Sequence, residues 1–173
     1  YTVDYFTNVN HVHQVLWLYA PSKPSTKYEE AFITRYPGDD LVDIIGFDRY
    51  SLGSTYASDI RDDCRATVEF CNERNKVATI AETGILGGIQ DIKEPDWFMN
   101  NFSRVVSHDS EGYCQQVVYA LTWTNSNDDY YWIPLKGQKT WPGFHEMYQD
   151  DVTIFADDTR FAELRKKYGY SPI

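Results

Sequence analysis

The hydrophobic residues of this chain form two kinds of pattern that alternate along the sequence. Short apolar runs, rich in β-branched residues and bounded by turn residues, occupy residues 15–20, 42–50, 77–84 and 116–123. Runs of this length and composition predict strands that are buried in a parallel sheet.

Between and around these runs, apolar residues recur at helical spacing. The longest such segment covers residues 56–74, where one apolar face is formed by Ala57, Ile60, Cys64, Thr67, Val68 and Cys71. Other helices are expected at residues 1–10, from a cap at Ser25 or Thr26, from Pro95 or Asp96, from Pro142 and from a cap at Asp158. A helix followed by repeated strand–helix units predicts an α/β fold with a parallel sheet, in a single domain over residues 1–173.

A carboxylate stands at the end of the third run. Residues 77–84 read VATIAETG, so Glu82 lies just before the Gly84 that ends the apolar stretch. Catalytic groups of α/β folds sit at the carboxyl ends of parallel strands, because the loops that follow are free to shape a pocket. Glu82 is therefore a candidate catalytic residue, although an ion pair with an arginine or a cap on the next turn would also explain it.

The second run also turns polar at its end. Asp48 and Tyr50 have the same parity, so their side chains are expected on one face of the strand. The loop at residues 85–94 contains Gly87 and Gly88, and it is long enough to line a site beside Glu82.

Composition and charge narrow the class of ligand. Aromatic residues make up 16% of the chain, with 5 Trp and 14 Tyr, which favours a surface that stacks on ring-shaped ligands. The net charge of −10 argues against nucleic acid or an anionic membrane as a partner, and it is compatible with a neutral carbohydrate. No apolar run approaches the roughly 18 residues of a membrane span.

All three cysteines, Cys64, Cys71 and Cys114, are expected to be buried thiols. Cys64 and Cys71 lie two turns apart on one predicted helix, about 10 Å along its axis, which is too far for a disulfide. Their pattern does not match a zinc site, and no metal or cofactor is expected.

Six segments occur in an order that is typical of a known family. They are YTVDYF at 1–6, WLYAP at 17–21, YPGDD at 36–40, VDIIGFDRY at 42–50, AETG at 81–84 and LTWTN at 121–125. Together they resemble the C-terminal half of glycoside hydrolase family 26, the β-mannanases. The resemblance implies strands five to eight of a (β/α)8 TIM barrel and an enzyme that cuts β-1,4-mannosidic bonds with retention.

This resemblance assigns a role to each candidate residue. It makes Glu82 the nucleophile, Tyr50 a hydrogen-bond donor to it, and Asp48 a residue that orients nearby polar groups. Trp123 matches the tryptophan beneath the sugar next to the cleaved bond, and Asn125 is a further candidate for sugar contact. Structural alternatives stay open: a barrel-rim aromatic for Tyr50, a buried ion pair for Asp48 and a core position for Trp123.

Two features depart from the family pattern. Thr124 stands where the family often has arginine, so one charged contact to a more distant sugar is absent. The family carries its acid/base on a His-Glu pair after strand four, and this chain starts after that strand. The pair His145–Glu146 follows Trp-Pro-Gly-Phe on a predicted helix, and we reject it because barrel catalytic residues come from strand ends.

A full barrel takes about 250 residues, and the resemblance supplies only half of its units. Half a barrel would leave open sheet edges and an uncovered interior, so we expect an N-terminal half, in the same or another chain. Alone, this segment is expected to be inactive. The expected whole is a secreted, periplasmic or cell-surface endo-β-1,4-mannanase acting on β-mannan or a related polysaccharide. A related β-glucanase, or a non-catalytic carbohydrate-binding module derived from such a barrel, remains an alternative.

Overall fold

The computed structural model describes residues 1–126 and 130–169. Its centre is a parallel sheet with the strand order β1-β2-β3-β4. The strands are β1 (Leu18–Tyr19), β2 (Ile44–Ser51), β3 (Val77–Ile85) and β4 (Val117–Thr122). Each strand pairs in parallel with its sequence neighbour, which confirms the α/β class predicted from the alternation of strands and helices.

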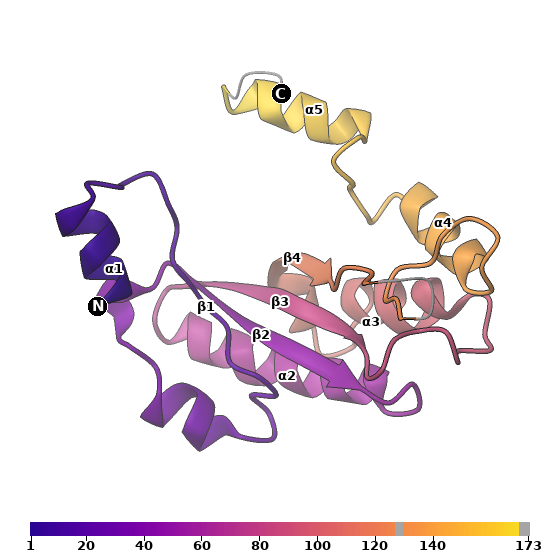
Figure 1. Cartoon of the computed structure of the whole chain (residues 1–173), viewed down its shortest axis with the longest axis horizontal. Coiled ribbons are helices and arrows are strands. Elements are labelled where there is room, and N and C mark those ends of the chain that lie inside the picture. Colours follow the sequence, from indigo (N-terminus) through magenta and orange to yellow (C-terminus); the bar gives the residue numbers. More distant parts are fainter. Residues whose placement is uncertain (127–129, 170–173) are drawn as a thin grey trace.

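Helical segments connect the strands (Figure 1). Those before the first strand are α1 (Thr2–Asp4) and η1 (Tyr5–Val9), and those between strands are η2 (Glu29–Thr34), η3 (Asp39–Leu41), α2 (Tyr56–Asn72), η4 (Phe98–Ser103), α3 (Arg104–Ser107) and η5 (Cys114–Gln116). Two helices, α4 (Trp141–Gln149) and α5 (Thr159–Lys167), follow the last strand. Helix α2 runs along one face of the sheet, whereas α5 lies apart from it (Figure 1). Asp158 caps α5 as predicted, because its side chain accepts the backbone N–H of Arg160.

Two apolar clusters hold α2 against the sheet. One includes Phe47, Ile60, Cys64 and Ile80, and the other includes Ile45, Val68, Cys71 and Ala78. Burial of an aliphatic side chain of this size contributes about 1.5–3 kcal/mol. The apolar face predicted for the helix is thus the face that packs on alternate residues of β2 and β3.

Strand β1 is shorter than the predicted run at residues 15–20. Leu18 and Tyr19 alone belong to the ladder, where they pair with Ile44 and Ile45. Leu16 is 72% exposed, so the start of the predicted run is not buried by any of the described residues.

The predicted cap at Ser25 or Thr26 is wrong. The helical segment η2 begins only at Glu29 and has no side-chain cap. Ser25 instead donates from its backbone N–H and its hydroxyl to Asp63 of α2, at 2.9 and 2.6 Å. A serine hydroxyl can bond to whichever polar group lies nearby, and here it bonds to the Asp63 carboxylate instead of capping the adjacent helix.

The expectation of three buried thiols is wrong for Cys64 and Cys114. Cys64 of α2 and Cys114 of η5 form a disulfide, with their Cα atoms 5.0 Å apart. The distance argument against a Cys64–Cys71 bond holds, but the fold supplies Cys64 with a partner 50 residues further along. Cys71 is a free, buried thiol, as predicted, and burial raises its pKa to about 12.

One irregularity in β3 decides which side chains share a face. The register jumps from Ile80 to Glu82 between successive residues of β2, so Ala81 is an extra residue, a β-bulge. Ile80 packs on α2, and strict alternation would place Glu82 on the same side. Because of the extra residue, Thr83 faces α2 instead, and Glu82 lies on the opposite face.

Apolar side chains are exposed at both ends of the sheet. Val118 and Leu121 of β4 are 62% and 45% exposed, and Val9 of η1 is 60% exposed.

Candidate active site

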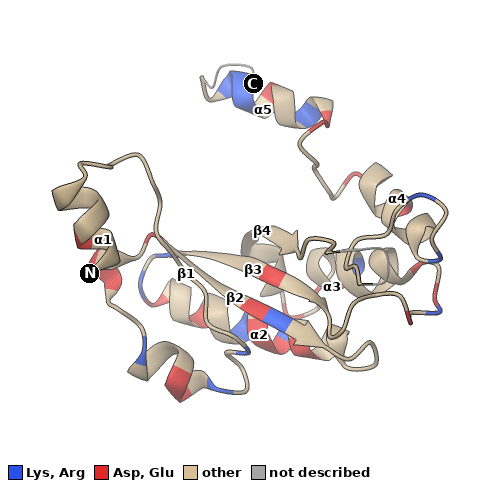
Figure 2. Cartoon of the chain, viewed as in Figure 1, with Lys and Arg blue, Asp and Glu red and all other residues tan. Residues whose placement is uncertain are grey.

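The carboxyl ends of β2 and β3 bring three predicted site residues together. Asp48 pairs in register with Glu82, and both lie on the face opposite to α2. The Tyr50 hydroxyl donates a hydrogen bond to Glu82 Oε2 at 3.1 Å. Figure 2 shows acidic positions side by side on β2 and β3. The parity of Asp48 and Tyr50 predicted from the sequence is confirmed by this contact.

Burial and charge shift the titration of two of these groups. Burial, together with the negative charge of the nearby Glu82, raises the pKa of Asp48 to about 6. Burial also raises the pKa of Tyr50 strongly, and its hydrogen bond to Glu82 adds to that effect. Tyr50 is therefore protonated at neutral pH and can act as a hydrogen-bond donor.

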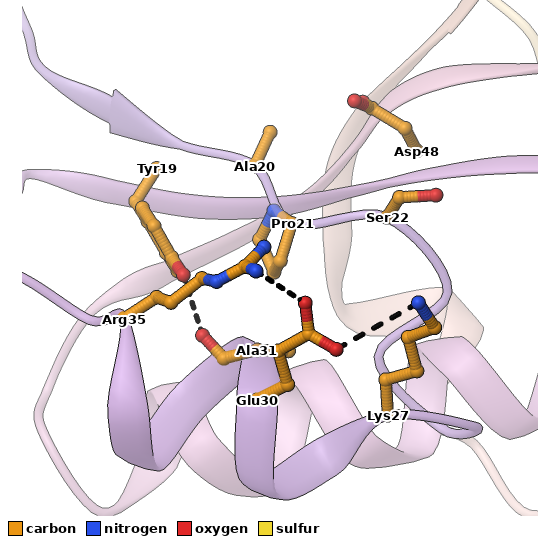
Figure 3. Close-up of a pocket in the computed structure, with 9 residues that line it drawn as sticks. All are labelled: Tyr19, Ala20, Pro21, Ser22, Lys27, Glu30, Ala31, Arg35 and Asp48. Carbon is orange, nitrogen blue, oxygen red and sulfur yellow. Dashed lines mark hydrogen bonds and ion pairs between the residues drawn. The ribbon is translucent and has the colours of Figure 1, made fainter.

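Among the residues that the structure describes, Asp48 has no ion-pair partner of the kind considered as its alternative role. Its Oδ1 atom is buried and has no hydrogen-bond partner among the described residues. Asp48 also borders a pocket of about 370 Å³ between β1 and η2, where Glu30 pairs with Arg35 at 2.6 Å and with Lys27 at 3.7 Å. The Asp48 carboxylate points away from that charged group (Figure 3).

Trp123 and Asn125 follow β4, on the far side of β3 from Asp48. The Trp123 backbone N–H donates to the Thr83 carbonyl at 3.2 Å, which ties it to the residue after Glu82. Its side chain is 39% exposed, so it is not a core plug. The Asn125 side chain accepts from the N–H groups of Trp132 and Ile133, at 2.9 and 3.0 Å, and donates to the Ile133 carbonyl at 2.8 Å.

Trp132 is a site residue that the sequence reasoning missed. Its indole N–H donates to the Ile85 carbonyl at 2.9 Å, and its ring lies edge-on to Tyr50, with centroids 6.3 Å apart. The ring fits because position 84 is a glycine, whose absent Cβ would overlap it. The sequence signal that could have indicated Trp132 was Gly84, close after the candidate nucleophile, together with the aromatic loop that follows β4.

Residues outside this cluster have other contacts. His145 lies on α4 beside Trp141 and Tyr148, and Glu146 pairs with Arg104 at 3.8 Å, away from the strand ends. Within residues 1–126 and 130–169, no group of three His, Cys, Asp or Glu side chains is placed to hold a metal ion. No helix in the described part of the chain is long and apolar enough to cross a membrane.

Comparison with known sequences agrees with the resemblance seen in the motifs. The profile of glycosyl hydrolase family 26 matches residues 1–120. A mannan endo-1,4-beta-mannosidase from Bifidobacterium adolescentis is 27% identical over 134 residues, which make up 72% of this chain and 13% of that protein.

Solved structures give the same relationship. An endo-beta-1,4-mannanase double mutant from Cellulomonas fimi matches with a TM-score of 0.79 and 26% identity, over 91% of this chain and 35% of that one. A GH26 beta-mannanase from Bacteroides ovatus matches with a TM-score of 0.71 and 27% identity, over 87% and 42%. The chain thus spans less than half the length of these relatives and corresponds to part of their fold. Since the family profile covers more than half of its residues, the chain belongs to glycosyl hydrolase family 26.

Proposed function

We propose that this chain carries the nucleophile side of a retaining hydrolase that cleaves β-1,4-mannosidic bonds. The observation that supports it most is the contact between Tyr50 and Glu82 at the carboxyl ends of two parallel strands. A carboxylate in that position, held by a donor that does not ionise, has the properties that a glycosidase nucleophile needs. The mannanase relatives favour mannan as the substrate class.

In this proposal, Glu82 attacks the anomeric carbon while a second carboxylic acid protonates the leaving glycosidic oxygen. The products are a covalent glycosyl ester on Glu82 and a released sugar. Water, deprotonated by the second carboxylate, then displaces Glu82 and restores the original anomeric configuration. The partner carboxyl must lie roughly 5 Å from Glu82 for this stereochemical outcome.

Tyr50 and Asp48 tune the nucleophile in different ways. The hydrogen bond from Tyr50 occupies Oε2 of Glu82 and leaves Oε1 free to attack. Asp48 has a buried oxygen without a partner, which is available to a sugar hydroxyl or to a polar group of a segment that closes the site. A neutral hydroxyl suits this position, because a bound donor removes the cost of the unpaired acceptor.

Aromatic residues supply the sugar-binding surface in this proposal. Trp123 supports the sugar ring at the cleaved bond, since stacking on an indole buries the apolar C–H face of a pyranose. Asn125 is proposed as a sugar contact, and its present hydrogen bonds also hold the backbone that carries Trp132. Trp132, packed against Tyr50, is proposed as a second aromatic contact for the substrate.

The acid/base belongs to an N-terminal half of the barrel in this proposal, so this segment alone is inactive. The exposed apolar residues of β4 and η1 support a covering segment of that kind. The Cys64–Cys114 disulfide supports a secreted, periplasmic or cell-surface location, because disulfides persist in oxidising compartments.

Replacement of Glu82 in the complete enzyme tests the assignment. We expect Glu82→Ala to lower mannan turnover by at least about 10³-fold, and azide to restore turnover by replacing the lost nucleophile and forming a glycosyl azide. Retention of more than a few per cent of activity would remove Glu82 from the role.

The matched control is Glu146→Ala, which deletes an exposed glutamate on α4 that contacts Arg104. We expect wild-type turnover, because an exposed ion pair contributes little to stability and Glu146 lies away from the strand ends. A complete wild-type protein that binds mannan oligosaccharides without cleaving them would favour the carbohydrate-binding alternative.

A further inference from the structure

The contact between α2 and the sheet changes from apolar to polar directly beneath the proposed nucleophile. Near the ends of β2 and β3, three polar residues that face α2 are each bonded to a polar side chain of that helix. The strand residues are Arg49, Ser51 and Thr83, and their helix partners are Asp63, Asp59 and Tyr56. We refer to these six residues as the α2 clamp.

The strongest part of the clamp is a buried ion pair. Arg49 and Asp63 are 4% and 0% exposed. The Arg49 guanidinium donates to both oxygens of Asp63, through Nε to Oδ2 and through Nη2 to Oδ1 at 2.8 Å. Asp63 Oδ1 also accepts from Ser25, so the carboxylate is saturated with donors. A bidentate pair of this kind fixes direction as well as distance.

Thr83 links the two site strands to each other and to the helix. Its hydroxyl donates to the Arg49 carbonyl at 3.0 Å and lies 2.6 Å from the Tyr56 hydroxyl. A threonine hydroxyl has one proton, so Tyr56 must be the donor in the second contact. The chain of bonds therefore runs from Tyr56 through Thr83 to the backbone of Arg49.

The position of these residues in sequence gives the clamp its relevance to the site. Arg49 lies between Asp48 and Tyr50, and Thr83 directly follows Glu82. Adjacent residues of a strand point to opposite faces, so fixing one side chain fixes the orientation of its neighbours. Locking Arg49 and Thr83 to the helix thereby sets how Tyr50 and Glu82 project on the other face.

We propose that the α2 clamp is a positioning device that holds Tyr50 and Glu82 in the geometry for attack, an inference that rests on the proposed function. Stability alone does not account for it, because a buried ion pair adds no more stability than apolar residues of equal volume. Further from the site, the same helix uses apolar contacts, such as those of Val68 and Cys71. Positioning explains why the hydrogen bonds between polar side chains of α2 and polar side chains of the strands gather under the strand ends.

Two conservative substitutions in the complete enzyme test this proposal. Thr83→Val keeps the side-chain shape and removes both of its hydrogen bonds, and Tyr56→Phe removes only the donor to Thr83. We expect kcat to fall by at least about tenfold in Thr83→Val, and less in Tyr56→Phe, with KM nearly unchanged, because a small misplacement of a nucleophile slows attack. The assays are run well below the unfolding temperature of each variant.

A direct readout of attack is the rate at which 2-deoxy-2-fluoro-β-mannosyl fluoride forms its covalent adduct with Glu82, measured by mass spectrometry. We expect this rate to fall in parallel with kcat. The matched control is Thr67→Val, because Thr67 is equally buried on α2 and its hydroxyl has no hydrogen-bond partner among the described residues. This variant should keep the wild-type rate.

The outcomes separate the two proposals. In the first outcome, the wild type is labelled at Glu82, and the variants Thr83→Val and Tyr56→Phe lose stability but are labelled at the wild-type rate. The clamp is then structural, and the positioning role is wrong. If the wild type cleaves mannan but is labelled on a different carboxylate, the assignment of Glu82 is wrong, and the positioning role is overturned with it.

Discussion

Replacing Gly84 with alanine would test how closely the aromatic loop is seated on the end of β3. A Cβ at this position would overlap Trp132 Cδ1, and it would lie 3.0 Å from Nε1 and 3.2 Å from Tyr50 Cε1. The backbone of Gly84 is not in the left-handed region that favours glycine, so alanine meets no conformational penalty there. The effect of the substitution is therefore steric.

The size of the effect follows from the contacts of Trp132. Its indole must move by about 1 Å to restore a carbon–carbon separation of about 3.5 Å. That movement would break the 2.9 Å hydrogen bond to the Ile85 carbonyl, which costs about 1 kcal/mol. Disturbing the edge-on contact with Tyr50 costs about 1 kcal/mol more. We expect the free energy of unfolding to fall by about 2 kcal/mol.

Urea unfolding of the complete protein would measure this loss, and a double-mutant cycle would assign it. In a Trp132→Ala background the obstacle is gone, so Gly84→Ala should cost less than about 0.5 kcal/mol. An equal loss in both backgrounds would refute the steric explanation.

Two further predictions concern Asp48 and the disulfide. The pKa of Asp48 is raised to about 6, so ionisation of this group destabilises the fold as pH rises through that value. Between pH 4 and 7, the free energy of unfolding of Asp48→Asn should therefore gain about 1 kcal/mol relative to wild type, after allowance for solvent screening. Parallel stability curves for the two proteins would contradict this. Cys64→Ala/Cys114→Ala should lose about 4 kcal/mol, because the bridge closes a loop over a sequence separation of 50. Thiol titration of the denatured wild type should give one free thiol, and three would show that the bridge does not form.

The order of elements and the family could be predicted from the sequence because both depend on local patterns. The apolar runs located all four strands of the sheet, and the polar ends of two of them located Tyr50 and Glu82. These features need only the period of a strand and the position of a residue relative to its end.

Long-range contacts could not be predicted in the same way. Ser25 is a residue type that favours helix N-caps, but its backbone N–H and its hydroxyl both donate to Asp63, which lies 38 residues away. Cys114 is 50 residues from Cys64, and Trp132 reaches Ile85 across 47 residues. Each of these pairings depends on how the elements pack, which a local pattern does not encode.

The single extra residue in β3 has a consequence for how sequences of this kind tolerate change. Because Ala81 is the unpaired residue, deleting it would leave a regular strand in which Ile80 still faces α2, Glu82 faces the other side and Thr83 faces α2 again. The bulge thus absorbs one residue of strand length without changing which side chains reach the proposed catalytic face. A homologue that lacks one position here could keep the same set of reactive side chains on that face.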